Sequence, residues 1–294
     1  MRHRARPGKH GWRRDRRGMA GAVVTVLFVI IFTTMLAGVA LYYVPMWSKE
    51  SESEHMNKVS NEFYTIRDGV NDQVSKGVTG SSLYSHVALT SGTTTSFLGI
   101  QGEPSRGTLA LDIDSSIFEL YDQDNASDIY GIGKGMLYFQ SHNGYYVNQE
   151  YSYEQGAVLV RQGTSSTVRE GAPPVLDRDA QGCLTLTVSL FSLFGEATSV
   201  TGTGSAGVET SIIHTEATMI PFPSAKNITL NGSTSHGDGW ARWINSSLRS
   251  TDPAENITSG NYTIVMDSDG FRFTAIGVRM LTIKFTVIEV KVSK

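Results

Sequence analysis

The chain has 294 residues, a formal net charge of −3 and a single cysteine, which permits a sizeable core and excludes an intramolecular disulfide framework. The first 17 residues hold eight Lys and Arg against one acid, leaving 17 basic and 27 acidic residues, a balance of −10, in residues 18–294. Nucleic-acid binding normally requires a basic patch, so an acidic body argues against a nucleic-acid partner.

A long uncharged segment follows the basic leader. No charged side chain occurs between Arg17 and Lys49, and most of these residues are apolar. About 20 apolar residues span a bilayer, and flanking Lys and Arg stay cytoplasmic. The sequence therefore predicts a single-pass transmembrane helix over 19–47, with a cytoplasmic N-terminus and an extracellular C-terminal part. Pro45 predicts a kink near the membrane surface, because proline removes a helical hydrogen bond.

The next segment, 48–78, has the pattern of an amphipathic stalk helix. Its apolar residues recur at spacings of three and four, which places them in one narrow stripe. The pattern leaves two partners open for this stripe, the β domain of the same chain and a neighbouring helix. The stripe consists of Met56, Val59, Phe63, Ile66, Val70 and Val74.

The remainder, 83–294, changes to a period of two, which is typical of strands. Asp267–Gly270 predicts a hairpin turn, and Trp240–Leu248 predicts a short helix with one apolar face. The fold class expected is α+β, with a long N-terminal hydrophobic helix followed by an antiparallel β-sandwich-like domain containing one short helix. The clearest strand patterns are Leu109–Ile113, Leu184–Leu190 and Leu281–Val287.

The order of these parts resembles a type IV pilin precursor, and the details fit the archaeal type IV pilin and archaellin group best. The resemblance covers residues 13–75 and starts in Arg13-Arg14-Asp15-Arg16-Arg17-Gly18. It implies that 1–18 is a leader of the class III signal peptide type, removed by a prepilin peptidase between Gly18 and Met19, directly after Arg16 and Arg17. Bacterial pilins usually carry a glutamate five residues after the cut, where this chain has Val23. Archaeal relatives often lack that acid.

The resemblance implies a pilin-like subunit at the cell surface, in a pilus-like filament or a secretion machinery. About 276 residues would remain after cleavage, which is large for a bulk pilus subunit and favours a minor pilin or pseudopilin with adhesive roles. Its expected partners are the membrane, other pilin-like subunits through the N-terminal helix, the prepilin peptidase, and an assembly platform with its cytoplasmic ATPase. No enzyme activity and no cofactor are expected.

Two alternatives remain for the N-terminal segment. An uncleaved helix would make the protein a single-pass, membrane-anchored surface adhesin or binding protein. The small residues Gly38, Val39 and Ala40 also offer a signal-peptidase site after Ala40. A secretory apolar region is normally 7–15 residues long, and this run is about twice that length, which disfavours the second alternative.

Several N-x-S/T sequons predict an exported and glycosylated surface. Most of them fall between residues 227 and 263. The glycosylation candidates are Asn125, Asn227, Asn231, Asn245, Asn256 and Asn261.

Features that suggest catalysis or metal binding are weak. Gly131–Gly135 lacks the spacing of a phosphate-binding loop, and Asp122–Asn125 and Asp267–Gly270 lack the twelfth-position glutamate of a calcium loop. Cys183 lies in an alternating run and is expected to be a small buried residue, with an intermolecular disulfide or a reactive thiol as alternatives. The sequence therefore predicts no catalytic and no metal site.

Overall fold

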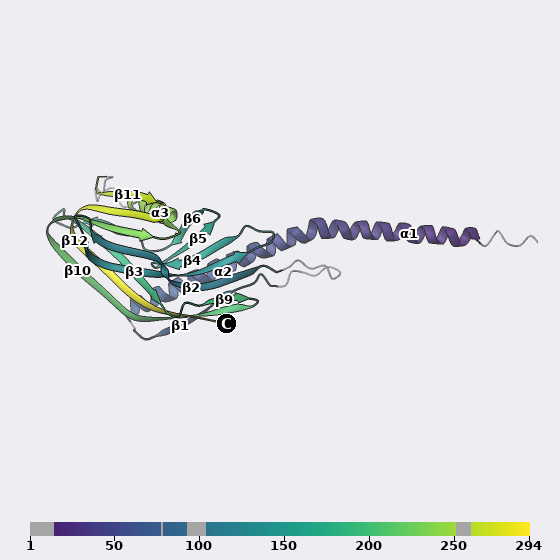
Figure 1. Ribbon diagram of the computed structural model, residues 1–294, viewed down its shortest axis with the longest axis horizontal. Helices are drawn as coiled ribbons and strands as arrows, with labels where there is room; N and C mark the ends of the chain where they lie inside the picture. The colour runs from purple at the N-terminus through teal and green to yellow at the C-terminus, as the bar shows by residue number, and fades with distance from the viewer. Residues whose placement is uncertain (1–14, 78, 93–103, 251–259) are drawn as a thin grey trace, which may run out of the picture.

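The computed structural model describes residues 15–77, 79–92, 104–250 and 260–294. A long helix at the N-terminal end leads into a large domain made mostly of strands, and the helix extends well beyond that domain (Figure 1). The α+β class is therefore confirmed. The helical elements are α1 (Asp15–Gly38), a π-helical turn (Val39–Tyr43), α2 (Val44–Lys76) and α3 (Gly237–Ser250).

The strands follow from the period-two patterns, although several are much longer than the patterns indicate. Their bounds are β1 Ser82–Ala88, β2 Arg106–Asp122, β3 Asn125–His142, β4 Gln149–Glu154, β5 Ala157–Gln162, β6 Ser165–Glu170, β7 Val175–Arg178, β8 Leu184–Phe194, β9 Ser199–Gly202, β10 Ser205–Ser233, β11 Tyr262–Asp267 and β12 Gly270–Ser293.

The predicted kink takes the form of a π-helical turn. The backbone N–H of Val44 donates to the carbonyl of Val39, five residues back instead of four. In a regular α-helix the ring of Pro45 would collide with the carbonyl of Leu41. The wider turn immediately before Pro45 accommodates the ring, so the helix continues into α2 with a gentle change of direction (Figure 1).

The described strands form one mixed, open sheet in the order β6-β5-β4-β3-β2-β10-β12-β8-β7, with β1 on β10, β11 on β12 and β9 on β2. The prediction of a purely antiparallel domain was wrong at one place, because β12 pairs with β8 in parallel. An alternating pattern reports which face of a strand is buried but carries no strand direction. The sandwich arrangement stays a prediction.

Two long strands join the parts of the sheet. One end of β10 pairs with β1, and the other end pairs with β2. β12 likewise pairs with β8 near its C-terminal end and with β11 near its N-terminal end. The ribbon formed by β10 and β12 is curved, so that the sheet bends around the inner elements (Figure 1).

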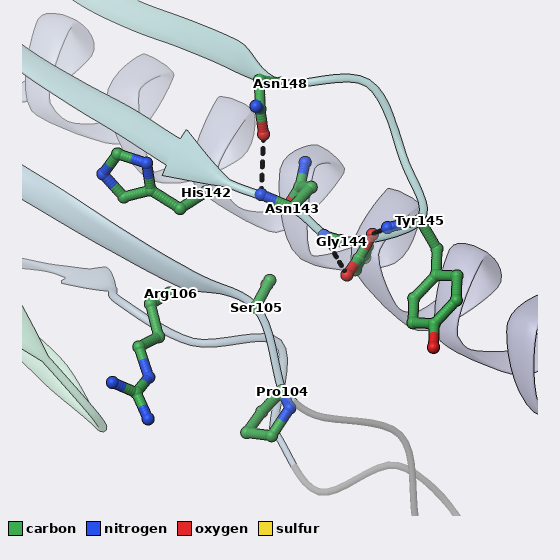
Figure 2. Close-up of a pocket in the computed structure, with 9 residues that line it drawn as sticks. Pro104, Ser105, Arg106, His142, Asn143, Gly144, Tyr145 and Asn148 are labelled. Carbon is green, nitrogen blue, oxygen red and sulfur yellow. Dashed lines mark hydrogen bonds between the residues drawn. The ribbon is translucent and has the colours of Figure 1, made fainter.

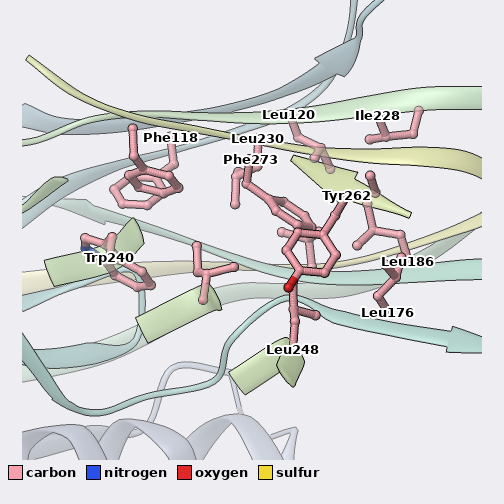
Figure 3. Packing of buried hydrophobic residues seen from close by; sticks show 14 of the residues in the cluster. Phe118, Leu120, Leu176, Leu186, Ile228, Leu230, Trp240, Leu248, Tyr262 and Phe273 are labelled. Carbon is pink, nitrogen blue, oxygen red and sulfur yellow. The ribbon is translucent and has the colours of Figure 1, made fainter. Parts of the chain in front are cut away.

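The apolar residues form two hydrophobic clusters. One surrounds α3, where Trp240 and Leu248 pack with Phe118 and Phe273 (Figure 3). The other lies along α2 and includes residues of β1, β4, β5 and β10. β5 contributes to both clusters, because Leu159 belongs to the first and Val158 to the second. This strand is therefore buried on both faces.

Candidate functional site: the N-terminal helix and its anchorage

The first half of the long helix presents apolar side chains to the outside. Phe28 is 68% exposed, and the large exposed apolar residues of α1 extend from Val23 to Met35. Leu41, in the π-helical turn, is 81% exposed. Within the described residues, this is the one helix long and apolar enough to cross a membrane. By length and composition it qualifies as a membrane anchor or a signal sequence. An apolar surface of this extent needs a lipid or protein partner.

The threonine hydroxyls of α1 are satisfied within the helix. The hydroxyls of Thr25 and Thr34 donate to the carbonyls of Gly21 and Ile30, each four residues earlier, and Thr33 does the same with Val29. These bonds need no water. The helix can therefore enter an apolar environment without leaving a hydroxyl unpaired.

The second half of the helix is part of the β domain. Five residues of the predicted stripe are fully buried, and Val74 is partly buried. α2 contacts two separate strand pairs, β1 with β10 and β4 with β5. The rings of Phe63 and Tyr151 are 6.2 Å apart between centroids. Of the two partners left open by the sequence, the structure shows the chain's own β domain.

This packing is close. Burial of each large apolar side chain of the stripe contributes about 1.5–3 kcal/mol to stability. At Gly69, an added Cβ would lie 1.9 Å from Cδ2 of Leu83, so the absence of a side chain lets α2 approach β1. The helix ends at Gly77, which has a positive φ of 62° and whose N–H donates to the carbonyl of Val74.

Glu52 connects the start of α2 to the loop between β3 and β4. Its carboxylate accepts the backbone N–H groups of Gly144 at 2.9 Å, Tyr145 at 2.8 Å and Tyr146 at 2.5 Å. Figure 2 shows Gly144 and Tyr145 on this loop. The residue is 2% exposed. Hydrogen bonds to a charged acceptor are stronger than neutral ones, and three of them satisfy this buried carboxylate. Glu52 therefore fixes the loop against the helix.

The end of β1 is held by a second set of side chains from α2. His55 Nε2 donates to the carbonyl of Ala88 at 2.9 Å, and the Glu62 carboxylate accepts the Ala88 N–H at 2.8 Å. Nδ1 of His55 then accepts the hydroxyl of Ser105 at 3.3 Å. Burial lowers the pKa of His55 and raises the pKa of Glu62. Both backbone groups of Ala88 are thus bound by one helix.

Two more contacts continue the anchorage toward the C-terminal end of α2. Arg67 forms an ion pair with Glu170 at the end of β6. Gln73 Nε2 donates to the carbonyl of Ser81 at 2.8 Å. Polar contacts therefore hold α2 to the domain from its first turns to its last, on more than one strand.

The predicted processing residues lie at the beginning of α1. Arg16, Arg17, Gly18 and Met19 have helical backbone, and their side chains lie outside the described part of the structure, as does the leader segment 1–14.

The sequons differ in their surroundings. Asn125 is exposed at the turn between β2 and β3. Asn227 accepts the Gly277 N–H, and Asn245 accepts the hydroxyl of Tyr262, through their side-chain carbonyls. Glycosylation at all these positions stays a prediction. The remaining candidates are the half-buried Asn231 and Asn261, and Asn256, which lies outside the described residues.

Cys183 is a free thiol and is half-buried, less enclosed than its alternating pattern indicates. It lies in the turn before β8, where its N–H donates to Asp179 Oδ1 at 2.8 Å. Its redox role stays open.

A buried polar cluster was not anticipated from the sequence. The ring of His236 contacts the hydroxyls of Ser152 and Ser166, at 3.0 Å each, and Glu150 Oε1 at 3.3 Å. His236 and both serines are fully buried, so the cluster joins the start of α3 to β4 and β6 without access for a substrate. Among the described residues, no group of three or more His, Cys, Asp or Glu could hold a metal ion.

Comparison with family models, with curated proteins and with solved structures finds no match for this chain. Functional conclusions therefore depend on the residues and on the geometry of the helix and its domain.

Proposed function

We propose that the protein is a pilin-like subunit, a minor pilin or pseudopilin, of an archaeal type IV pilus-like surface filament or secretion machinery. One observation carries this proposal. A single helix of 57 residues, Ala20–Lys76, has an exposed apolar first half and a second half that is built into the core of the β domain.

This division suits a subunit that moves from a membrane into a filament. Lipid covers α1 while the subunit is stored in the membrane. After extraction by the assembly platform and its ATPase, the α1 helices of neighbouring subunits cover one another. Because α2 is anchored at Glu52, Ala88 and Glu170, the domain follows the helix as one body. A sandwich-like head, supported by the two buried faces of β5, would form the outer layer.

Removal of the leader supports the same proposal. Cleavage after Gly18 takes eight basic side chains and one acid away from the helix N-terminus. That end already carries the positive pole of the helix dipole, so additional positive charge there is unfavourable. It would also have to enter an apolar filament core. Cleavage therefore converts a membrane-orienting signal into a helix end that can pack against other helices.

The domain beyond α1 would be extracellular, carried on a single-pass helix with a cytoplasmic N-terminus. The basic leader sets this orientation. The acidic character of the outer domain and its sequons are consistent with a glycosylated surface, with Asn125 the most accessible position described.

Processing can be tested by changing the cleavage junction. We expect Gly18→Val to accumulate in the membrane as full-length precursor and to be missing from sheared filaments, with the domain still folded. Gly38→Val is the matched control, since an added Cβ at Gly38 meets no atom within 4 Å and the junction is intact. Intact mass of both variants gives the answer. Normal trimming of Gly18→Val would overturn the peptidase assignment, and an untrimmed wild type would favour a membrane-anchored adhesin.

A further inference from the structure

A polar pocket of about 690 Å³ opens at the start of α2 (Figure 2). Residues from the start of β2 and from the loop between β3 and β4 form its walls. Figure 2 shows that the helix passes behind this loop. Its lining includes Glu52, Arg106, His142, Asn143, Tyr145 and Asn148.

The pocket contains a pair of uncompensated basic side chains. Arg106 and His142 are directly opposite each other in the ladder between β2 and β3, and both are exposed. Within the described residues, neither side chain has a hydrogen bond or ion pair. An anion beside the guanidinium group of Arg106 would offset its charge, and guanidinium groups bind phosphate oxygens particularly well.

The acidic residue in the pocket does not neutralise Arg106. The Glu52 carboxylate is buried and already accepts three backbone N–H groups. Asn148 Oδ1 accepts the N–H of Asn143, so the amide nitrogen of Asn148 can point to a ligand. Tyr145 adds an exposed phenol on the same loop. The Arg106 guanidinium and the Asn148 amide nitrogen are therefore donors that an anionic ligand can use, and Asn143 Oδ1 is a buried acceptor without a partner in the same pocket.

The position of the pocket indicates where such a ligand comes from. Trp47, the last aromatic residue of the apolar segment, precedes Glu52 by five residues, about 7.5 Å along a helix. Tyr and Trp residues concentrate at the boundary between membrane and water. Tyr145 and Val147, both 46% exposed, lie on the loop that Glu52 fixes. With α1 across a bilayer, this loop and pocket lie at the level of the lipid headgroups.

We propose that this pocket binds the phosphate of a membrane phospholipid headgroup at Arg106, holding the β domain against the bilayer surface. The inference rests on the membrane-spanning α1 of the proposed function and does not depend on filament formation. Extraction of the subunit would break this contact, so the pocket marks the stored state of the protein.

The test uses the full chain in liposomes of two compositions, anionic phosphatidylglycerol and an uncharged glycolipid that lacks phosphate. Thermal unfolding of the β domain is followed by near-ultraviolet circular dichroism. Because a ligand of the folded state stabilises it, phosphatidylglycerol should raise the unfolding midpoint of the wild type by about 3 °C relative to glycolipid. Arg106→Glu should abolish this difference. Arg272→Glu, which alters an exposed arginine in the hairpin of β11 and β12, should retain it.

Three results would overturn the proposal. They are an equal midpoint in both lipids for the wild type, an equal rise in Arg106→Glu, and loss of the rise in Arg272→Glu. Soluble glycerol phosphate added to the glycolipid liposomes separates the two sources of phosphate. A full rise there would assign the pocket to a free phosphate ester and overturn the lipid assignment. Liposome flotation is scored separately, because failure to insert would contradict the anchor itself, whereas failure at the pocket leaves insertion intact.

Discussion

The two halves of the long helix are alike in length and differ in what covers them. From Ala20 onward α1 is mostly apolar on all sides and exposed, whereas α2 has one narrow apolar stripe that its own domain buries. A stripe is sufficient for a helix that packs on one surface, and apolar residues all round are required where the whole circumference is enclosed. The distribution of apolar residues around a helix thus indicates whether the same chain buries it or whether lipid or another protein does.

The polar groups of the two halves differ in the same way. The polar side chains of α2 that bond to the domain include Glu52, His55 and Glu62. Within the apolar part of α1 the hydrogen-bonding side chains are threonines, which bond to their own helix. Directional bonds therefore fix α2 in one position, while α1 keeps a surface that suits lipid and protein equally.

The largest effect is expected from an acidic substitution in each half. Phe63→Asp puts a carboxylate into a fully buried site. We expect this to lower the free energy of unfolding by about 4 kcal/mol or more, which is more than a domain of this size tolerates. The β domain should lose its cooperative unfolding transition. Phe28→Asp should leave that transition unchanged and prevent membrane insertion, because a charge near the middle of a spanning helix costs about 3 kcal/mol or more.

Phe63→Leu serves as the control for Phe63→Asp, since it keeps an apolar side chain in the core and should preserve the fold with reduced stability. Urea unfolding and flotation with liposomes measure the two properties separately. A folded domain in Phe63→Asp would show that the stripe is not core and would remove the distinction between the halves.

A smaller effect is expected at Glu52. Glu52→Gln replaces a charged acceptor of three N–H groups by a neutral one and should destabilise the domain by about 1–3 kcal/mol. Glu54→Gln changes an exposed residue two positions further along the helix. Its free energy of unfolding should stay within about 0.5 kcal/mol of the wild-type value. Urea midpoints of the two variants compare them directly. Equal stability of both variants would mean that the loop is not held by this carboxylate.

The smallest effect depends on pH and comes from His55. Burial lowers the pKa of its ring below the ordinary 6.5, so the unfolded chain takes up the proton first as the pH falls. The stability that neutral His55 contributes is therefore present above pH 6.5 and is lost as the pH drops below that value. His55→Gln should remove this part of the pH dependence between pH 7.5 and 5.5.

The difference between the unfolding free energies of wild type and His55→Gln, measured across that range, isolates the histidine from Glu62. The raised pKa of Glu62 changes the stability in the opposite direction as the pH falls, because the folded protein holds this proton more tightly than the unfolded chain does. A difference that does not change with pH would contradict a buried neutral His55.

Local patterns in the sequence predict the local elements of this fold. The helix up to Lys76, the hairpin at Asp267–Gly270 and the short helix with Trp240 each follow from residues close together in the chain. The spacing of Phe63 and Ile66 also identifies buried positions without naming what buries them.

Contacts between distant segments could not be predicted in this way. Glu52 is more than 90 residues from the loop it binds, and its position among exposed acids on the helix gives no sign of its burial. The parallel pairing of β8 and β12 likewise joins distant segments, and their alternating patterns do not indicate whether the two strands run parallel or antiparallel. Arg106 and His142 are paired in the sheet only because β2 and β3 form a hairpin in one particular register.

The most direct test of the proposed pilin-like role is the N-terminal residue of the wild-type protein in its native membrane fraction, read by intact mass. The account predicts a chain that begins at Met19. A chain that begins at Met1 would contradict processing and leave a membrane-anchored protein, and a chain that begins at Leu41 would remove the exposed helix and contradict the account altogether.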